Sequence, residues 1–80
     1  MYCVYVLHSV QYDKIYIGCT SDLTQRLLSH NKLATRGWTI RYRPWKLIHV
    51  EEYPDKARAF NREKQLKSHQ GREFIRKELL

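Results

Sequence analysis

The sequence predicts an α+β fold in which a three-stranded antiparallel sheet is flanked by helices, in the order β-β-α-β-α-α. Three observations support this prediction. Two short runs rich in β-branched and aromatic residues lie near the N-terminus, a third run follows in mid-chain, and the remaining apolar residues recur at helical spacing. The 80 residues contain no internal repeat or linker, so we expect one domain over residues 1–80.

Three segments are expected to form the strands. Residues 2–8 and 14–19 are joined by a short polar segment that is expected to turn, so they form an antiparallel hairpin. Residues 45–51 form the third strand, after a basic, irregular connection over residues 32–44. The residues expected on one face of that third strand are Trp45, Leu47 and His49.

The first helix follows the hairpin. It is expected to begin after a capping hydroxyl from Thr20 or Ser21 and to end near Asn31. Arg26 and His30 are four residues apart on this helix, so both are expected to project from the same side.

Two further helices are expected after the third strand. Residues 54–55 open the second helix, and Gly71 is expected to end or kink it. Residues 72–80 carry apolar side chains at helical spacing and are expected to form a short third helix. One broad face of the second helix is expected to carry Ala59, Phe60, Glu63, Leu66 and Lys67.

The composition favours a nucleic acid as the partner. Fifteen Lys and Arg residues against eight Asp and Glu residues give a formal net charge of +7. Such a charge attracts phosphate polyanions. A basic protein without a nucleic-acid ligand, or one that touches acidic lipid, has the same composition, and charge says nothing about catalysis.

Location and cysteine usage agree with an intracellular protein. No apolar stretch is long enough to cross a bilayer, and residues 1–5 lack the features of a signal peptide. We therefore expect a cytoplasmic protein that does not enter a membrane. Cys3 and Cys19 form no C-x-x-C pair and are expected to be two small, semi-buried thiols.

Six short motifs occur in a specific order. Two triplets, Cys3-Val4-Tyr5 and Tyr16-Ile17-Gly18, lie on the two strands of the predicted hairpin. The four later motifs are residues 20–27 with Arg26, Ser29-His30-Asn31, residues 43–48 with Glu51, and residues 59–64 with Glu63, followed by Lys67. Together they resemble the GIY-YIG nuclease superfamily, in particular its small stand-alone bacterial members and the N-terminal domain of excision-repair nucleases. Cys3 stands where that family has a glycine.

The resemblance implies a divalent-metal-dependent endonuclease that hydrolyses phosphodiester bonds in DNA, in repair, recombination or defence. Tyr5 would be the general base, Tyr16 would hydrogen-bond the substrate or the water, and Arg26 would brace the phosphate oxygens. Glu63 would hold Mg²⁺ or Mn²⁺, and His30 would be a proton relay or a prop for Tyr5. A free phenol has a pKa of about 10, so Arg26 and the ion are expected to favour the Tyr5 phenolate.

Alternatives exist for the residues and for the whole chain. Taken singly, the tyrosines fit strand aromatics, Arg26 a solvated helix side chain, His30 a helix C-terminal charge, and Glu63 a surface ion pair. The whole chain could instead be a non-catalytic nucleic-acid-binding module that acts with a protein partner. The side chains expected to contact DNA are Lys14, Arg36, Trp38, Arg41, Arg43 and Lys67. Trp38 could instead anchor its loop, and Arg72, Arg76 and Lys77 fit either a phosphate-facing surface or simple solubility.

Overall fold

The computed structural model describes all residues, 1–80. Its sheet contains β1 (Tyr2–Ser9), β2 (Lys14–Thr20) and β3 (Lys46–Tyr53), in the spatial order β2-β1-β3 with both pairs antiparallel. These strands and the helices that follow them confirm the predicted α+β fold and its element order. None of the helices has the length and apolar character needed to span a membrane.

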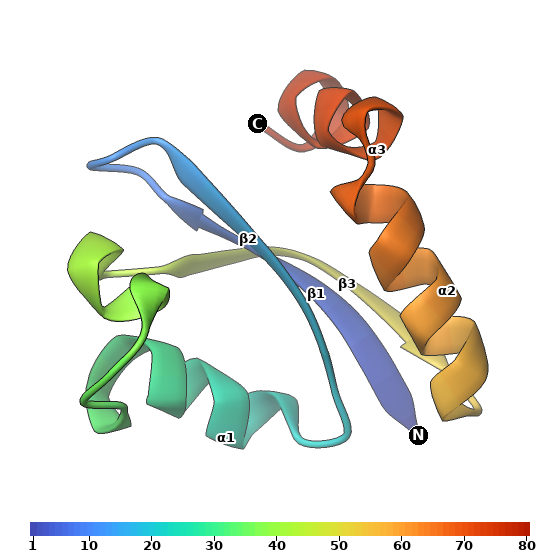
Figure 1. Ribbon diagram of the computed structural model, residues 1–80, viewed down its shortest axis with the longest axis horizontal. Helices are drawn as coiled ribbons and strands as arrows, with labels where there is room; N and C mark the ends of the chain where they lie inside the picture. The colour runs from blue at the N-terminus through green and yellow to red at the C-terminus, as the bar shows by residue number, and fades with distance from the viewer.

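Helices cover both faces of the sheet (Figure 1). One layer contains α1 (Leu23–Leu28), which continues into the π-helical turn η1 (Ser29–Leu33), and the 3₁₀ turn η2 (Trp38–Tyr42). The other layer contains α2 (Lys56–Lys67) and α3 (His69–Phe74). Strand β2 lies at one edge of the sheet, and in Figure 1 it crosses in front of the other strands between the two helical layers.

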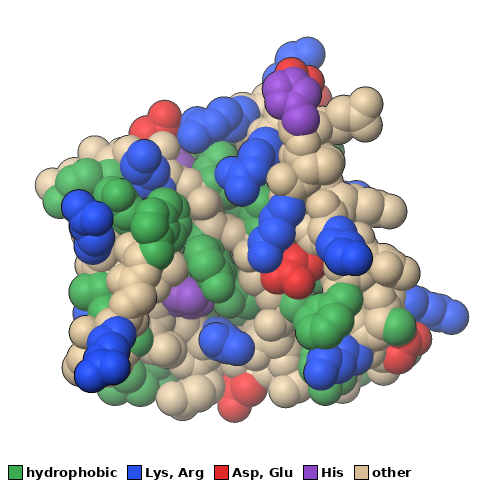
Figure 2. Space-filling model, viewed as in Figure 1, with side chains coloured by type: hydrophobic (Ala, Val, Ile, Leu, Met, Phe, Trp, Pro, Cys, Tyr) green, Lys and Arg blue, Asp and Glu red, His purple; other side chains and the backbone are tan.

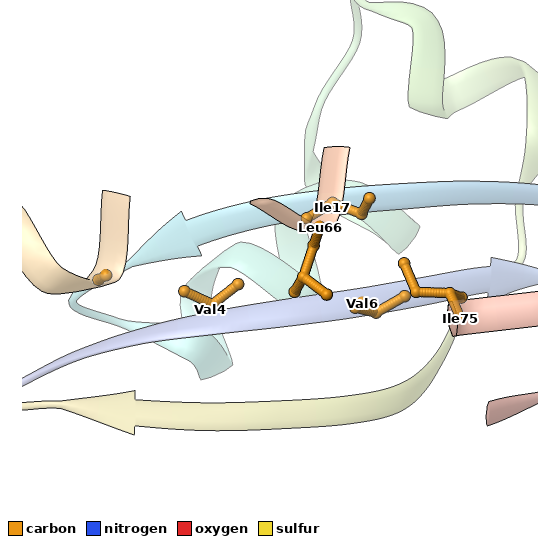
Figure 3. Packing of buried hydrophobic residues seen from close by; sticks show 6 residues of the cluster. Val4, Val6, Ile17, Leu66 and Ile75 are labelled. Atoms are coloured by element: carbon orange, nitrogen blue, oxygen red, sulfur yellow. The ribbon is translucent and has the colours of Figure 1, made fainter. Parts of the chain in front are cut away.

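The central strand β1 is buried on both faces because its side chains alternate between two apolar clusters. Tyr5 and Leu7 pack with Trp45 on the side of α1. The cluster on the side of α2, shown in Figure 3, consists of Val4, Val6, Ile17, Ala59, Leu66 and Ile75. Of the residues predicted to share one broad face of the second helix, Ala59 and Leu66 are buried against the sheet, whereas Phe60 is 44% exposed.

The predicted alternation along the third strand is wrong at His49. A β-bulge shifts the pairing of β1 with β3, so that Val6 faces His49, the next residue faces Leu47, and Ile48 is extra. His49 therefore lies on the side of α2, where its Nε2 is 2.6 Å from the Glu51 carboxylate, which in turn binds an arginine of α2. Nothing local in the sequence marks a bulge, because the extra residue is itself a good strand former.

The capping prediction for the first helix is also corrected. Asp22 is the N-cap, and its carboxylate accepts a hydrogen bond from the Gln25 amide at 3.1 Å. The Thr20 hydroxyl instead accepts from the Asp22 amide at 3.0 Å and shapes the turn before the helix. Helical structure extends past the expected end near Asn31, because η1 runs to Leu33.

The break between the last two helices lies at Ser68 and not at Gly71. The Ser68 hydroxyl donates to the Gln65 carbonyl at 2.6 Å and accepts from the Gly71 amide at 3.2 Å, so this residue ends α2 and caps α3. Gly71 lies inside α3, where a Cβ would overlap the Gln65 carbonyl oxygen. The chain ends in a π-helical turn, Ile75–Leu79, which buries Ile75.

Candidate active site

The candidate site is built where β1 and β2 face the α1 layer. Tyr5 on β1 lies directly opposite Gly18 on β2. A Cβ at Gly18 would overlap the hydroxyl and ring of Tyr5, so the tyrosine ring lies across β2 only because a glycine is there. The Tyr5 side chain is almost completely buried, at 1% exposure.

Three of the predicted residues converge around the Tyr5 hydroxyl. Its oxygen is 3.0 Å from Nε2 of His30, and the other ring nitrogen of His30, Nδ1, is 3.2 Å from the Thr39 hydroxyl. The Tyr16 ring centroid lies 4.6 Å from that of His30 and 6.1 Å from that of Tyr5. The two tyrosines and the histidine therefore form one contact cluster, and the hydrogen bond between His30 and Thr39 is a contact that sequence reasoning missed.

Burial decides the protonation of this cluster. Burial raises the pKa of Tyr5 well above its ordinary value, Tyr16 raises it further, and Arg26 lowers it by a smaller amount. Arg26 therefore favours the phenolate, as expected, but its effect is smaller than that of burial, and the net pKa of Tyr5 is raised. Burial also lowers the pKa of His30, and the positive charges of Arg26 and Arg43 lower it further, so the imidazole is neutral at neutral pH.

Glu63 and Arg26 approach the cluster from opposite layers. The Glu63 carboxylate on α2 is 20% exposed, and one of its oxygens is 3.3 Å from the Lys67 ammonium group. Its negative charge raises the pKa of Tyr5 on β1 and of Cys19 on β2. Arg26 is exposed on α1 and acts on the pKa of Tyr5 and of His30.

The donor set suits a hard cation that keeps most of its water. No group of three or more His, Cys, Asp or Glu side chains is placed to surround a metal ion. Mg²⁺ needs no such cage, because it binds through one or two carboxylates and takes its remaining ligands from water and substrate phosphate. Glu63 fits that requirement, since its carboxylate is partly exposed and its charge reaches Tyr5.

A cleft of about 480 Å³ runs beside Tyr16. It lies along β2, and Lys67 of α2 and Trp38 of η2 contribute to its walls. The lining residues are Asp13, Lys14, Ile15, Tyr16, Ile17, Trp38, Lys67, Arg72 and Arg76. Figure 2 shows hydrophobic side chains across the middle of this view of the molecule, bordered by Lys and Arg, with few acidic side chains.

The cleft gathers only some of the residues expected to contact DNA. Lys14, Trp38 and Lys67 line it. Arg36 and Arg41 are exposed but lie outside its lining. The sequence left the roles of Arg72 and Arg76 open, and the fold brings both to the cleft, where Arg76, in the turn after α3, pairs with Asp13.

Arg43 is held inside the protein. Its guanidinium donates to the carbonyl oxygens of Ser29, His30 and Ala34, at 3.0, 2.5 and 2.8 Å respectively. These bonds tie Arg43 to the first two carbonyls of η1, the turn that carries His30, and to the carbonyl of the residue that follows it. Asn31 adds a second tie, since its side chain bonds the Trp45 backbone at both N–H and C=O. A DNA contact by Arg43 stays a prediction. In the fold, Arg43 helps to hold the backbone of the turn that positions His30.

The two cysteines are free thiols, as expected. Cys3 is buried and Cys19 is partly buried. Across the hairpin, Cys19 lies opposite Val4, the neighbour of Cys3, and not opposite Cys3 itself. Because neighbouring positions on a strand face opposite sides of the sheet, the two thiols point to opposite faces.

Comparison with known proteins agrees with this geometry. The family model described as the GIY-YIG catalytic domain matches residues 1–77. No curated protein and no solved structure gave a significant match. Because the family match covers nearly the whole chain and includes every residue of the cluster around Tyr5, the chain belongs to the GIY-YIG catalytic domain family, whose members are usually nucleases.

Proposed function

We propose that the protein is a divalent-metal-dependent endonuclease that hydrolyses phosphodiester bonds in DNA. The observation that carries the proposal is the convergence of Tyr5, Tyr16 and His30 in one cluster, with Arg26 and Glu63 approaching from opposite sides of the sheet. Attack on a phosphodiester adds negative charge to an already anionic group, so it needs a proton acceptor for the water and positive charge near the phosphoryl oxygens.

The hydrogen bond from Tyr5 to His30 supplies a path for the proton. Tyr5 is a neutral phenol, and a neutral phenol accepts a proton only if it loses its own. With the Nδ1 proton of His30 directed at Thr39, Nε2 is free to accept the Tyr5 proton. The phenol oxygen then takes a proton from the attacking water, the water oxygen bonds to phosphorus, and the bond to the leaving oxygen breaks. The net result moves one proton from water to His30.

The remaining residues would position and neutralise the phosphate. Arg26 is exposed beside Tyr5 and His30, and its forked donors would bind the non-bridging oxygens. The Tyr16 hydroxyl would orient the water or the phosphate. Glu63 would hold the divalent ion, which when bound supplies positive charge to the phosphoryl and leaving oxygens. We consider DNA repair, recombination and defence against foreign DNA as the processes that such an enzyme would serve.

A cleavage assay tests the proposal directly. Purified protein is incubated with supercoiled plasmid and with single-stranded DNA, in Mg²⁺, in Mn²⁺ and in excess chelator. We expect nicking or cleavage in the presence of either metal and none in chelator. DNA binding that persists with no metal-dependent cleavage would contradict the proposal and favour a binding module that acts with a partner.

A further inference from the structure

The cleft beside Tyr16 has the size and the position of a nucleotide site. Its volume of about 480 Å³ lies within the range of about 300–1,000 Å³ that is typical of small-molecule sites. Because Tyr16 belongs both to the cleft and to the cluster around Tyr5, a ligand in the cleft lies next to the proposed reaction centre.

Trp38 gives the cleft an aromatic wall. Its ring centroid lies 4.8 Å from that of Tyr42 and 5.7 Å from that of Trp45, so aromatic neighbours support it. Trp45 is itself fixed, since its indole N–H donates to the Thr39 carbonyl at 2.7 Å. Trp38 nevertheless remains 47% exposed. A supported aromatic ring with an exposed surface is suited to stacking on a nucleic-acid base.

Basic side chains surround this wall. Lys14, Lys67 and Arg72 come from β2, α2 and α3 and line the same cleft. The one acidic residue of the lining, Asp13, is engaged, because its carboxylate lies 3.0 Å from Arg76 and 3.1 Å from His8. The cleft therefore combines an aromatic surface with a local excess of positive charge, as in proteins that bind unpaired strands.

We propose that the cleft binds one unpaired nucleotide of a DNA strand, with its base stacked on Trp38 and the adjoining phosphates near Lys14, Lys67 and Arg72. The proposal rests on the nuclease function to the extent that it places this nucleotide next to the scissile phosphate. A base inside a duplex is covered on both faces by its neighbours, so it has no free face for Trp38. The preferred substrate is then a single strand or a duplex from which one nucleotide is displaced.

Binding measured in chelator tests the proposal separately from cleavage. The probes are a fluorescent oligothymidine strand, a fully paired hairpin duplex, and the same duplex with one bulged thymidine. The variants are Trp38→Ala, Trp38→Leu, which keeps apolar volume against Tyr42 and Trp45, and Trp38→Phe, which keeps an aromatic face. Leu33→Ala is the control, since Leu33 is 56% exposed and lies outside the cleft.

We expect Trp38→Ala and Trp38→Leu to weaken binding of the oligothymidine strand by about fivefold to 100-fold, the loss expected for one stacked base. Trp38→Phe and Leu33→Ala should retain most of the affinity, and binding of the paired duplex should be unaffected by all four changes. If Trp38→Leu weakens binding of the bulged duplex, the cleft also accepts a nucleotide displaced from a duplex. If that affinity is unchanged, the cleft accepts only single strands.

A second comparison tests the basic side chains. Lys14→Ala removes a cation of the cleft, while Lys46→Ala removes one from the start of β3, outside the cleft. We expect only the first change to weaken strand binding and to reduce its salt dependence. The proposal is overturned if Trp38→Leu binds the strand as tightly as the original protein, or if it weakens the paired duplex equally. If either result is found while the original protein cleaves DNA in a metal-dependent way, only the cleft assignment is overturned. If strand binding depends on Trp38 but the original protein shows no metal-dependent cleavage, only the nuclease assignment is overturned.

Discussion

The hydroxyl oxygen of Tyr5 lies 3.0 Å from Nε2 of His30, although the two residues are 25 positions apart in the chain. Burial holds both groups neutral, because it raises the pKa of the phenol and lowers the pKa of the imidazole. In such a pair the imidazole is the better proton acceptor and the phenol the better donor. The pair therefore explains how a tyrosine with a high pKa could serve as the general base at neutral pH.

Replacing Tyr5 by phenylalanine should abolish cleavage while the fold is kept. The change deletes only the hydroxyl that would receive the proton of the water, so we expect the cleavage rate to fall by more than about 100-fold. The lost hydrogen bond to His30 should lower the free energy of unfolding by about 1–2 kcal/mol, measured by urea titration. Tyr12→Phe is the control, because Tyr12 is 45% exposed. A Tyr5→Phe protein with full activity would assign the base to another group.

The cleavage rate should depend on pH through His30. The imidazole must be neutral to accept a proton, and burial, Arg26 and Arg43 hold its pKa below the ordinary value of 6.5. Single-turnover rates should therefore be high at neutral pH and fall as the pH drops through this lowered pKa. The folded protein binds this proton less tightly than the unfolded chain, so acid in the same window should also lower stability. A rate that begins to fall well above pH 6.5 in the original protein would contradict the assignment.

Replacing Glu63 by alanine should separate binding from cleavage. Glu63 is the carboxylate proposed to hold the divalent ion, so cleavage in Mg²⁺ should fall by more than about 100-fold. DNA affinity in chelator should stay the same or rise slightly, because a negative charge is removed and Lys67 is released from its ion pair. Glu52→Ala on β3 provides an exposed carboxylate as the control. A Glu63→Ala protein that cleaves normally would remove this residue from the site.

The fold followed from local signals in the sequence. Runs of β-branched and aromatic residues predicted the hairpin of β1 and β2, and helical spacing predicted the positions of α1 and α2. The tyrosines, Arg26, His30 and Glu63 could be named because their order and spacing match a family. Residues 54–55 are expected to open the second helix, and the structure makes Asp55 its N-cap, with the side chain accepting from the Arg58 amide.

The features that the sequence did not predict depend on contacts between distant segments. The bulge at Ile48 depends on how two strands pair, and the break at Ser68 depends on how α3 folds back to place Gly71 against Gln65. The three bonds from Arg43 to the backbone of η1 and of the residue after it join residues 9 to 14 positions apart. The net pKa direction of Tyr5 depends on its burial, which no spacing of charges reveals.

Adding one methyl group at Gly18 should disturb the site through Tyr5. A Cβ at this position overlaps the Tyr5 hydroxyl, and the buried ring has little room to move. We expect Gly18→Ala to lower the free energy of unfolding by about 1–3 kcal/mol and to remove most cleavage activity. Gly71→Ala is the matched comparison, because it overlaps the Gln65 carbonyl away from the cluster. It should lower stability while the folded fraction still cleaves; equal activity of both variants would contradict the role of Gly18.

Glu51 should stabilise the packing of α2 on the sheet in a pH-dependent way. Burial raises its pKa, but hydrogen bonds from Arg62, Tyr53 and His49 outweigh burial and lower the pKa to about 2. The Arg62 guanidinium binds both carboxylate oxygens, at 2.8 and 3.1 Å, and both side chains are partly buried. Glu51→Gln should therefore lower the free energy of unfolding at neutral pH by about 1–3 kcal/mol.

The pH dependence separates this pair from an uncharged contact. Because the folded pKa is depressed, the stabilisation is complete above the ordinary value of 4.5 and is lost as the pH falls from there toward about 2. Urea unfolding of the original protein and of Glu51→Gln should therefore differ most at neutral pH and converge in acid. Glu52→Gln, on the same strand but exposed, should follow the original protein throughout. A difference between the Glu51→Gln and original proteins that stays constant down to acid pH would show that shape, and not the charge of Glu51, holds Arg62 and α2 in place.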